Sequence, residues 1–431
     1  MKKIYEDSVG YEILRYIADP YIHGAFKKIR YEGMENLPKE GAIILSPNHC
    51  DALMDPLTVL AMNHEKKVFV ARADLFQKPV LRKILTYFKI MPIHRVRDGF
   101  RNVLQSENTI EKSIEVLNNL VPFCILPEGR HRPMHSLLPL GKGISRVAIG
   151  ADKALKGQQH VYIVPVGCEY GDYFRYRAST LLITIGKPID VSAYVAEHAD
   201  RNEAMLLNDI RSLTAAAMKK LIVYIPDDDD YEATWEGAKL VSGQVPESDL
   251  RGRFAANRNA AERIGKLREE QPDKARKLFE KVLDFTRERK RARVSLHATY
   301  AKHPLATALW RTLKTLVCLP FVLAMAIASS PALGVGEKLA HGVKDQAFRN
   351  SFRCGVLIVL WTILLVVWAI VLFCTVKWYW ALAALALLVP APMLVYEWVE
   401  QLRRCASSWR YLCNGRIRSM KKELMNSLNT I

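Results

Sequence analysis

The stretch Ala42-Ile43-Ile44-Leu45-Ser46-Pro47-Asn48-His49-Cys50-Asp51-Ala52-Leu53-Met54-Asp55-Pro56 joins a short apolar run to a region with helical spacing. The run at 42–46 predicts a buried strand, and the pattern at 53–62 predicts a helix. His49 falls in the turn between them, and Asp55 follows six residues later. A histidine whose ring is held by a carboxylate can take a proton from an alcohol. The stretch therefore predicts a strand–turn–helix unit that activates a hydroxyl group.

The spacing of His49 and Asp55 restricts how their side chains can meet. An ideal helix turns about 100° per residue, so positions six apart lie about 240° apart around its axis. We therefore expect His49 in the turn before the helix and Asp55 about one turn inside it. Pro47 favours extended backbone before the turn, and Asp51 is the predicted N-cap of the helix.

Cys50 stands beside His49, which raises the alternative of a cysteine nucleophile paired with the histidine. Adjacent residues point in different directions on a strand or a helix, and this disfavours the pair. The chain has eight cysteines, with no CxxC pair and no metal-ligand spacing. This usage is typical of a reducing compartment. We expect no metal site, because His131 and His135 lack clustered carboxylates beside them.

The region 41–190 alternates short apolar runs with helical patterns. The predicted strands are 42–46, 67–71, 89–93, 122–126, 161–167 and 180–185, and the predicted helices are 53–62, 78–87, 103–119 and 142–155. Such alternation is typical of an α/β domain in which helices flank a central sheet. With a further helix at 200–223, we predict a domain over 31–225.

The chain of 431 residues has a formal net charge of +18, which predicts a basic surface. Such a surface suits nucleic acid, anionic lipid or phosphorylated substrates. No recognised nucleic-acid motif accompanies the charge, and long apolar segments in the same chain favour lipid. We therefore expect anionic membrane lipid as a partner and no nucleic acid.

Three apolar segments, 315–335, 355–376 and 378–396, approach the ~20 residues that a bilayer requires. Basic residues flank them, and basic loops prefer the cytoplasmic side. All the basic stretches share that side only if the first segment dips in and returns while the other two form a spanning hairpin. We predict a re-entrant or interfacial segment at 304–335, a transmembrane hairpin at 352–397, and a basic tail at 398–431. The α/β domain would then lie on the cytoplasmic side.

Two further regions flank the predicted domain. In the N-terminal region 1–30, residues 9–30 have helical spacing, and we expect an amphipathic helix there that either lies on the membrane or packs on the core. Residues 226–303 are charged and helical, and they end in Arg287-Glu288-Arg289-Lys290-Arg291-Ala292-Arg293. Because this basic run precedes apolar segments, we expect it to contact lipid headgroups.

A second chemical signal, Leu126-Pro127-Glu128-Gly129-Arg130-His131-Arg132, follows a predicted strand. Glycine after a strand lets the backbone approach a ligand closely, and a guanidinium can bind phosphate oxygens in a bidentate manner. Glu128 can accept a hydrogen bond from a substrate hydroxyl. Three shorter signals accompany it along the chain: Ile93-His94-Arg95, Gly141-Lys142-Gly143 and Val164-Pro165-Val166.

Taken in order, these residues resemble the motifs of the glycerolipid acyltransferase family, which includes 1-acylglycerol-3-phosphate and glycerol-3-phosphate acyltransferases. Asn48-His49 with Asp55 is similar to the first motif, and Ile93-His94-Arg95 is similar to the second. Leu126-Pro127-Glu128-Gly129-Arg130 is similar to the third, and Val164-Pro165-Val166 to the fourth. The match spans about residues 30–190.

The resemblance implies a role for each matched residue. His49 would be the general base on the acceptor hydroxyl, and Asp55 would orient its ring. The acceptor phosphate would be bound by groups of the later motifs: Arg95, Glu128, Gly129, Arg130 or Arg132, with Lys142 as a weaker counterpart. Asn48, in the first motif, is likewise a weaker match. The donor would be an acyl thioester, either acyl-CoA or acyl carrier protein, with no cofactor and no metal. The acceptor would be glycerol 3-phosphate, its monoacyl form or a lysophospholipid.

Two departures from the family pattern refine these expectations. Five residues separate His49 from Asp55 where four are usual, as in the subgroup with fungal-type glycerol-3-phosphate and dihydroxyacetone-phosphate acyltransferases. The third motif reads Gly129-Arg130-His131-Arg132 in place of Gly-Thr-Arg, which leaves either arginine for the phosphate.

Two other classes stay open at this point. A lipid hydrolase normally has a G-x-S-x-G elbow or a metal, and the sequence has no such elbow. A non-catalytic lipid-binding protein built on the same fold is disfavoured because His49 and Asp55 are both present.

Overall fold

The computed structural model describes residues 3–93 and 101–429 of the chain. These residues form two compact units built from interleaved segments. Unit 1 comprises Met1–His23, Ile29–Tyr173 and Leu181–Ile222. Unit 2 comprises Gly24–Lys28, Phe174–Thr180 and Val223–Ile431.

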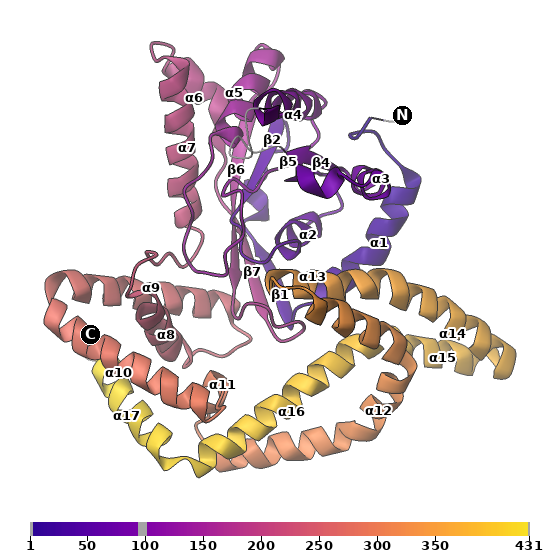
Figure 1. The fold of residues 1–431 in the computed structure, drawn as a ribbon, viewed down its shortest axis with the longest axis vertical. Helices are drawn as coiled ribbons and strands as arrows, with labels where there is room; N and C mark the ends of the chain where they lie inside the picture. Colours follow the sequence, from indigo (N-terminus) through magenta and orange to yellow (C-terminus); the bar gives the residue numbers. More distant parts are fainter. Residues whose placement is uncertain (1–2, 94–100, 430–431) are drawn as a thin grey trace. The chain divides into compact units, whose positions relative to one another are not determined.

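Unit 1 is built on the predicted sheet. Its strands are β1 Lys28–Glu32, β2 Ala42–Pro47, β3 Val68–Arg72, β4 Ile90–Ile93, β5 Phe123–Cys124, β6 Val161–Tyr170, β7 Thr180–Ile185 and β8 Ile189–Asp190. The strand order is β1-β7-β6-β2-β5-β3-β4, with β8 beside β6 (Figure 1). Neighbours from β6 to β4 run parallel, whereas β7 and β8 are antiparallel to β6.

The centre of the sheet places three strand ends together. All six residues of β2 are buried, as expected of a parallel strand covered on both faces. Its residues pair in register with β6 from Ala42↔Val161 to Pro47↔Val166, and with β5 at Ile44↔Phe123. The carboxyl ends of β5, β2 and β6 therefore lie side by side, which is where ligands bind in open α/β sheets.

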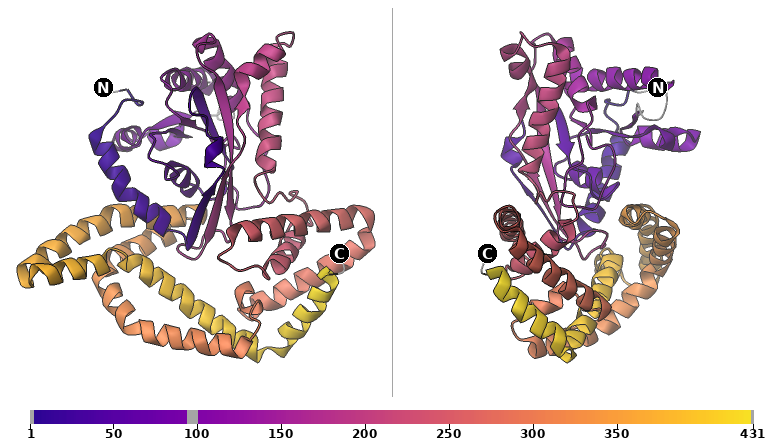
Figure 2. Two further views of the ribbon diagram at one scale, coloured as in Figure 1. Left: turned by 180° about the vertical axis from the view of Figure 1, so that it is seen from behind. Right: turned by 60° about the vertical axis from the view of Figure 1, so that its left-hand side comes forward.

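Helices flank this sheet in the views of Figures 1 and 2. They are α1 Val9–Gly24, α2 Met54–Leu60, α3 Pro79–Tyr87, α4 Arg101–Asn118, α5 Gly143–Leu155, α6 Val191–Glu197 and α7 Glu203–Lys219, with short 3-10 helices at Met34–Asn36 and Ala73–Phe76. Helices α5, α6 and α7 contact β6, and α4 contacts β2, β4 and β5. The main core lies between these helices and the strands. The predicted α/β class is thus confirmed.

Two sequence predictions for unit 1 were wrong in their extent. The predicted helix over 9–30 ends at Gly24, and residues 28–32 form β1 instead. The reason is visible in Lys28-Ile29-Arg30-Tyr31-Glu32, where charged and apolar residues alternate with the period of a strand. The predicted helix over 200–223 is the shorter α7, and α6 precedes it.

Unit 2 is helical. Its helices are α8 Tyr231–Ser242, α9 Leu250–Glu270, α10 Pro272–Arg291, α11 Leu296–Thr299, α12 Pro304–Gly342, α13 Ala347–Val356, the π-helical η4 Leu357–Trp361, α14 Thr362–Thr375, α15 Trp378–Leu388, α16 Ala391–Cys413 and α17 Gly415–Asn429. The basic C-terminal tail is folded, because α17 contacts α8 and α10. It contributes Ile417, Leu424 and Leu428 to a core shared with these helices.

In the part of the chain that the structure describes, two helices are long and apolar enough to cross a membrane, Pro304–Gly342 with 39 residues and Ala347–Thr375 with 29. A third span results if α15 and α16, bent by 45° at their junction, count as one. The segment predicted as re-entrant lies within the single helix α12, which bends along its length (Figure 1). Pro320 and Pro331 inside α12 each remove a helical hydrogen bond and favour this bend. The membrane topology stays a prediction.

Candidate active site

His49 and Asp55 meet in the way their spacing allows. His49 lies in the turn after β2, and Asp55 is the second residue of α2. The His49 Nδ1 atom is 2.7 Å from Asp55 Oδ2. The His49 side chain is 16% exposed, whereas that of Asp55 is fully buried. A carboxylate can only accept, so the Nδ1 atom carries the proton and Nε2 is left to accept one.

Asp55 also holds the backbone of the turn. Its Oδ2 atom accepts hydrogen bonds from the N–H groups of Cys50 at 2.7 Å and Asp51 at 2.9 Å. Its Oδ1 atom accepts a hydrogen bond from the Tyr170 hydroxyl at 2.5 Å. Four donors therefore surround one buried carboxylate, and this keeps the charge in place beside His49.

The prediction that Asp51 caps the helix was wrong. The N-cap position is Leu53, and no side chain caps the helix there. The turn runs two residues further than expected, through Ala52 with a φ of 39°, in the left-handed region. Asp51 instead accepts a bond at its backbone carbonyl, from Met54 N–H at 2.8 Å.

The sequence did not predict Tyr170 as a site residue, because β6 ends three residues later than predicted. Tyr170 follows Val166 and Cys168 at alternate positions and so shares their face of the strand. Burial, together with the nearby charge of Asp55, raises the pKa of Tyr170 well above its usual value. The phenol therefore keeps its proton and donates a hydrogen bond to Asp55.

Cys50 is a structural residue rather than a nucleophile. Burial raises the pKa of its thiol well above the usual value, and Asp55 adds to the shift, so the reactive thiolate does not form. Its sulfur is 3.2 Å from Asn48 Nδ2. Asn48 is buried and bridges β2 to β6, with its amide bonded to Cys168 N–H at 2.6 Å and to Cys168 carbonyl at 3.1 Å.

Glu128 fixes the position of His49 from a second loop. Its Oε1 atom accepts from His49 N–H at 2.7 Å, and its Oε2 atom accepts from Leu138 N–H at 2.9 Å. Burial raises the pKa of Glu128 to about 7, against the two backbone hydrogen bonds that lower it. Both oxygens are thus engaged with backbone, which the sequence did not reveal. The predicted contact with a substrate hydroxyl stays a prediction.

The residues predicted to bind phosphate differ in how close they lie to His49. Arg132 N–H donates to the His49 carbonyl at 3.0 Å, and its guanidinium donates to Ser136 Oγ at 3.1 Å. Arg130 is exposed, and so is Lys142, which directly precedes α5. Arg95 lies outside the described residues. The structure therefore brings Arg132 to the His49 turn and leaves Arg130 on the surface.

Gly129 has a φ of 70°, and a Cβ added there would meet nothing within 4 Å. The glycine therefore serves a left-handed backbone, and the space beside it is open. The ring of His131 lies 5.4 Å from that of His49.

A buried polar contact adjoins this site, with His135 Nδ1 2.8 Å from Glu169 Oε1. The His135 ring lies 5.2 Å from Tyr173, whose ring lies 5.6 Å from that of Tyr170. No sequence signal linked His135 to Glu169. Within residues 3–93 and 101–429, no group of three or more His, Cys, Asp or Glu side chains could hold a metal ion.

Comparison with known proteins identifies this region. Residues 28–169 match the Acyltransferase family model, in agreement with the family that the motifs resemble. Among solved structures, the chain is similar to the 1-acyl-sn-glycerophosphate (LPA) acyltransferase PlsC from Thermotoga maritima. That similarity has 19% sequence identity and a TM-score of 0.36, and it covers 49% of this chain and 77% of PlsC. Among curated proteins, no sequence matches significantly.

Proposed function

We propose that this protein is a membrane-bound acyltransferase of phospholipid biosynthesis. It transfers a fatty acyl group from an acyl thioester to the hydroxyl of glycerol 3-phosphate or 1-acylglycerol 3-phosphate. The observation that carries the proposal is the 2.7 Å contact of His49 Nδ1 with a fully buried carboxylate. That carboxylate accepts three further hydrogen bonds and so has one position.

In this mechanism His49 Nε2 takes the proton of the acceptor hydroxyl as its oxygen attacks the thioester carbonyl. A C–O bond forms, the C–S bond breaks, and the proton passes from His49 to the thiolate that leaves. Asp55 holds the ring in the required tautomer and stabilises the imidazolium that forms between the two proton transfers. The thioester is already activated, so the step uses neither a cofactor nor a metal.

For the acceptor phosphate, Arg132 is the stronger of the two motif arginines. The hydrogen bond from its backbone N–H to the His49 carbonyl ties the residue that carries this guanidinium to the turn that carries the base. Gly129 leaves open space beside the same loop. We assign Glu128 a positioning role, because both of its oxygens hold backbone N–H groups. Arg95, Arg130 and Lys142 are proposed as additional cations for the phosphate.

Membrane attachment is supported by the long apolar helices of unit 2. Unit 1 also exposes apolar side chains on α1 and α3, among them Val9 at 79%, Ile13 at 55% and Val80 at 71%. Other residues of α1, such as Tyr11 and Ile22, are buried, so this helix has both an inner and an outer apolar face. We propose that the outer face contacts the cytoplasmic surface of the bilayer, where an acylated product must partition.

The test is an acyl-transfer assay on the purified full chain in neutral detergent, with labelled acyl-CoA or acyl carrier protein as donor. The acceptor panel holds glycerol 3-phosphate, 1-acylglycerol 3-phosphate, lysophosphatidylcholine and water alone. The proposal predicts labelled product with one of the two glycerol phosphates. Product from lysophosphatidylcholine alone would indicate a remodelling enzyme, and free fatty acid without acceptor would indicate a hydrolase. Either outcome overturns the assignment.

A further inference from the structure

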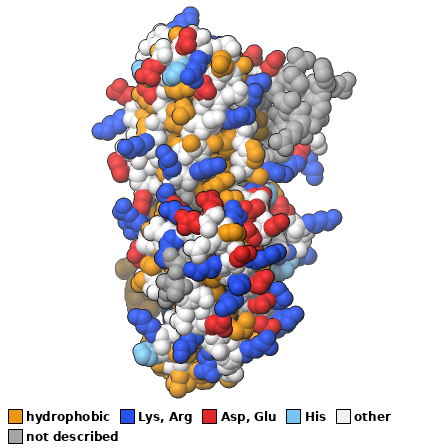
Figure 3. Space-filling view, turned by 90° about the vertical axis from the view of Figure 1, so that its left-hand side faces the viewer, with side chains coloured by type: hydrophobic (Ala, Val, Ile, Leu, Met, Phe, Trp, Pro, Cys, Tyr) orange, Lys and Arg blue, Asp and Glu red, His pale blue; other side chains and the backbone are white. Residues whose placement is uncertain are grey.

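Unit 2 contains a cleft of about 460 Å³, and all the residues that line it lie outside the acyltransferase domain at 28–169. Seven of them are arginine or lysine, and Glu400 is the one acid among them. On the face drawn in Figure 3, by contrast, basic side chains lie among acidic ones. The cleft therefore concentrates positive charge.

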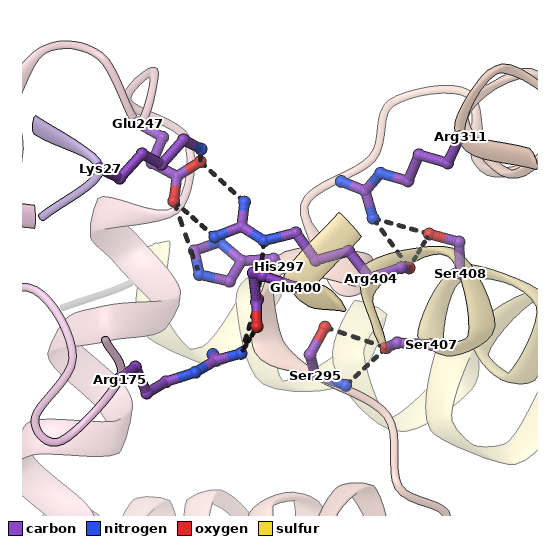
Figure 4. A network of polar contacts seen from close by, with 10 residues as sticks. All are labelled: Lys27, Arg175, Glu247, Ser295, His297, Arg311, Glu400, Arg404, Ser407 and Ser408. Atoms are coloured by element: carbon purple, nitrogen blue, oxygen red, sulfur yellow. Dashed lines mark hydrogen bonds and ion pairs between the residues drawn. The ribbon is translucent and has the colours of Figure 1, made fainter. Parts of the chain in front are cut away.

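The deepest cations of the cleft are already neutralised. Arg404 is 5% exposed, and its two terminal nitrogens each lie 2.9 Å from a carboxylate oxygen of Glu247. Arg175 donates to both oxygens of Glu400 (Figure 4). Arg289, 8% exposed, pairs with Glu236 and donates to the Val294 carbonyl at 3.1 Å. These arginines line the bottom of the cleft, but their charge is already paired and so is not available to a ligand.

Three further arginines at the cleft are not neutralised. Arg293, Arg403 and Arg410 are exposed and have no carboxylate partner within the described part of the chain. Arg403 and Arg410 lie seven residues apart on α16, so they share one face about 10 Å apart along the axis. Ala406 and Ser407 lie between them on that face and leave it hollow. Arg410 donates to the carbonyl of Arg293 at 3.3 Å, which joins the third arginine to the other two.

Exposed apolar side chains of α12 lie close to the cleft. Arg311 of α12 donates to Ser408 of α16 at 2.7 Å, which aligns the start of α12 with the cleft. Next to Arg311, Trp310 is 65% exposed, and Leu313 is 55% exposed. Exposed tryptophan beside apolar helices is typical of the headgroup level of a bilayer. Leu402, 45% exposed, brings an apolar side chain into the cleft itself.

We propose that this cleft binds the phosphate headgroup of an anionic phospholipid. Arg293, Arg403 and Arg410 donate to the phosphate oxygens, while Leu402 contacts the apolar part of the lipid. This site goes beyond the acyl-transfer function proposed above, because none of its residues belongs to the acyltransferase domain. It would fix the depth of α12 and α16 at an anionic membrane surface.

The test measures binding of a fluorescent phosphatidylglycerol to the purified full chain in neutral detergent. The double variant Arg403→Gln/Arg410→Gln is expected to bind at least tenfold more weakly than the wild type. The matched control, Arg263→Gln/Lys266→Gln, removes two exposed cations from α9 and should bind like the wild type. Ala406→Leu fills the hollow without changing the charge and should also weaken binding. Melting curves in lipid-free detergent check that all variants are folded.

Three outcomes would overturn the proposal. In the first, the α9 control loses as much affinity as the double variant, which would indicate non-specific charge attraction. In the second, inorganic phosphate or glycerol 3-phosphate displaces the lipid as effectively as unlabelled phosphatidylglycerol does, which would indicate a site for soluble phosphate. In the third, phosphatidylcholine displaces it equally well, which would show that anionic charge is not recognised.

Discussion

Each of the two units buries a cluster of charges, and the two clusters differ in what they leave exposed. In unit 1, one buried carboxylate, Asp55, is surrounded by four donors, and one of them is the partly exposed ring of His49. In unit 2, Arg404 lies between Glu247 and Glu400, with Lys27, Arg175 and His297 around them (Figure 4). The first cluster presents a reactive nitrogen, whereas the second neutralises itself.

The buried Glu128 and the partly buried Glu247 show the same contrast in their pKa values. Glu128 has only backbone N–H groups for its oxygens, and burial raises its pKa to about 7. Burial also disfavours the charged form of Glu247. The cationic partners Arg404, His297 and Lys27 outweigh this effect and hold the pKa of Glu247 well below the usual value. We infer that the unit 1 cluster is organised for chemistry and the unit 2 cluster for stability. Each of the following variants is expected to change either the reaction rate or the stability of the fold more than the other.

The largest effect on rate is expected for Asp55→Asn. The neutral amide no longer stabilises the imidazolium of His49, and we expect kcat to fall by about 10³-fold. The measurement is kcat of the full chain in detergent, normalised to the amount of folded protein, which is checked by a melting curve. Asp51→Asn is the control, since it neutralises a second buried carboxylate of the same turn while Asp55 keeps its contact with the His49 ring, and it should stay within about threefold of the wild type. Equal losses in the two variants would contradict the pairing.

The largest effect on stability is expected for Arg404→Met. It leaves the carboxylates of Glu247 and Glu400 without their shared guanidinium, which should destabilise the fold by about 3–5 kcal/mol. The melting temperature in detergent should fall clearly, while kcat of the protein that stays folded should change only a few fold. Arg403→Met, one residue away and exposed, should melt like the wild type. If both variants melt alike, the buried network does not stabilise unit 2.

Glu128 predicts a pH dependence with a definite sign. Its folded-state pKa of about 7 exceeds the usual value of 4.5, so the folded state binds this proton more tightly than the unfolded state does. The associated stability is fully present below pH 4.5 and is lost as the pH rises through about 7, to a total of roughly 3 kcal/mol. Melting temperatures of the wild type and Glu128→Gln, measured from pH 5 to 8, should therefore diverge. Parallel curves would contradict the shift.

The smallest effect is expected for Tyr170→Phe. It removes one of the four hydrogen bonds to Asp55 and keeps the ring, so we expect kcat to fall by about tenfold, or roughly 1.4 kcal/mol. The acceptor KM should change little, because Tyr170 contacts the carboxylate and not the acceptor in this mechanism. Tyr173→Phe, in the same aromatic group, is the control and should change kcat less than twofold. A loss confined to KM would assign Tyr170 to substrate binding instead.

The two clusters also differ in how well the sequence predicts them. His49 and Asp55 are joined by one turn, so the strand, the turn and the helix could be predicted together, and their contact followed from the spacing. The strands at 42–46 and 180–185 were predicted within a residue of their true ends because their apolar runs are continuous. The two-residue strand β5 was predicted too long because apolar residues continue past its pairing.

What the sequence could not predict depends on contacts between distant positions. Tyr170 reaches Asp55 across 115 residues, and Glu128 reaches the His49 backbone across 79. Arg404 and Glu247 are 157 residues apart. Glu128 could be predicted as a motif residue, but its backbone partners could not. Tyr170, Glu247 and Arg404 each look like an ordinary strand residue or a solvated charge in their own segments, and only the folded chain shows their partners.

The variant His49→Ala tests whether His49 is the base of an acyl-transfer reaction. Formation of labelled product from an acyl thioester and the preferred acceptor would be measured in a single turnover, with the melting curve of the same preparation. We expect a rate at least 10³-fold below that of the wild type with an unchanged melting temperature. A rate within tenfold of the wild type would contradict it.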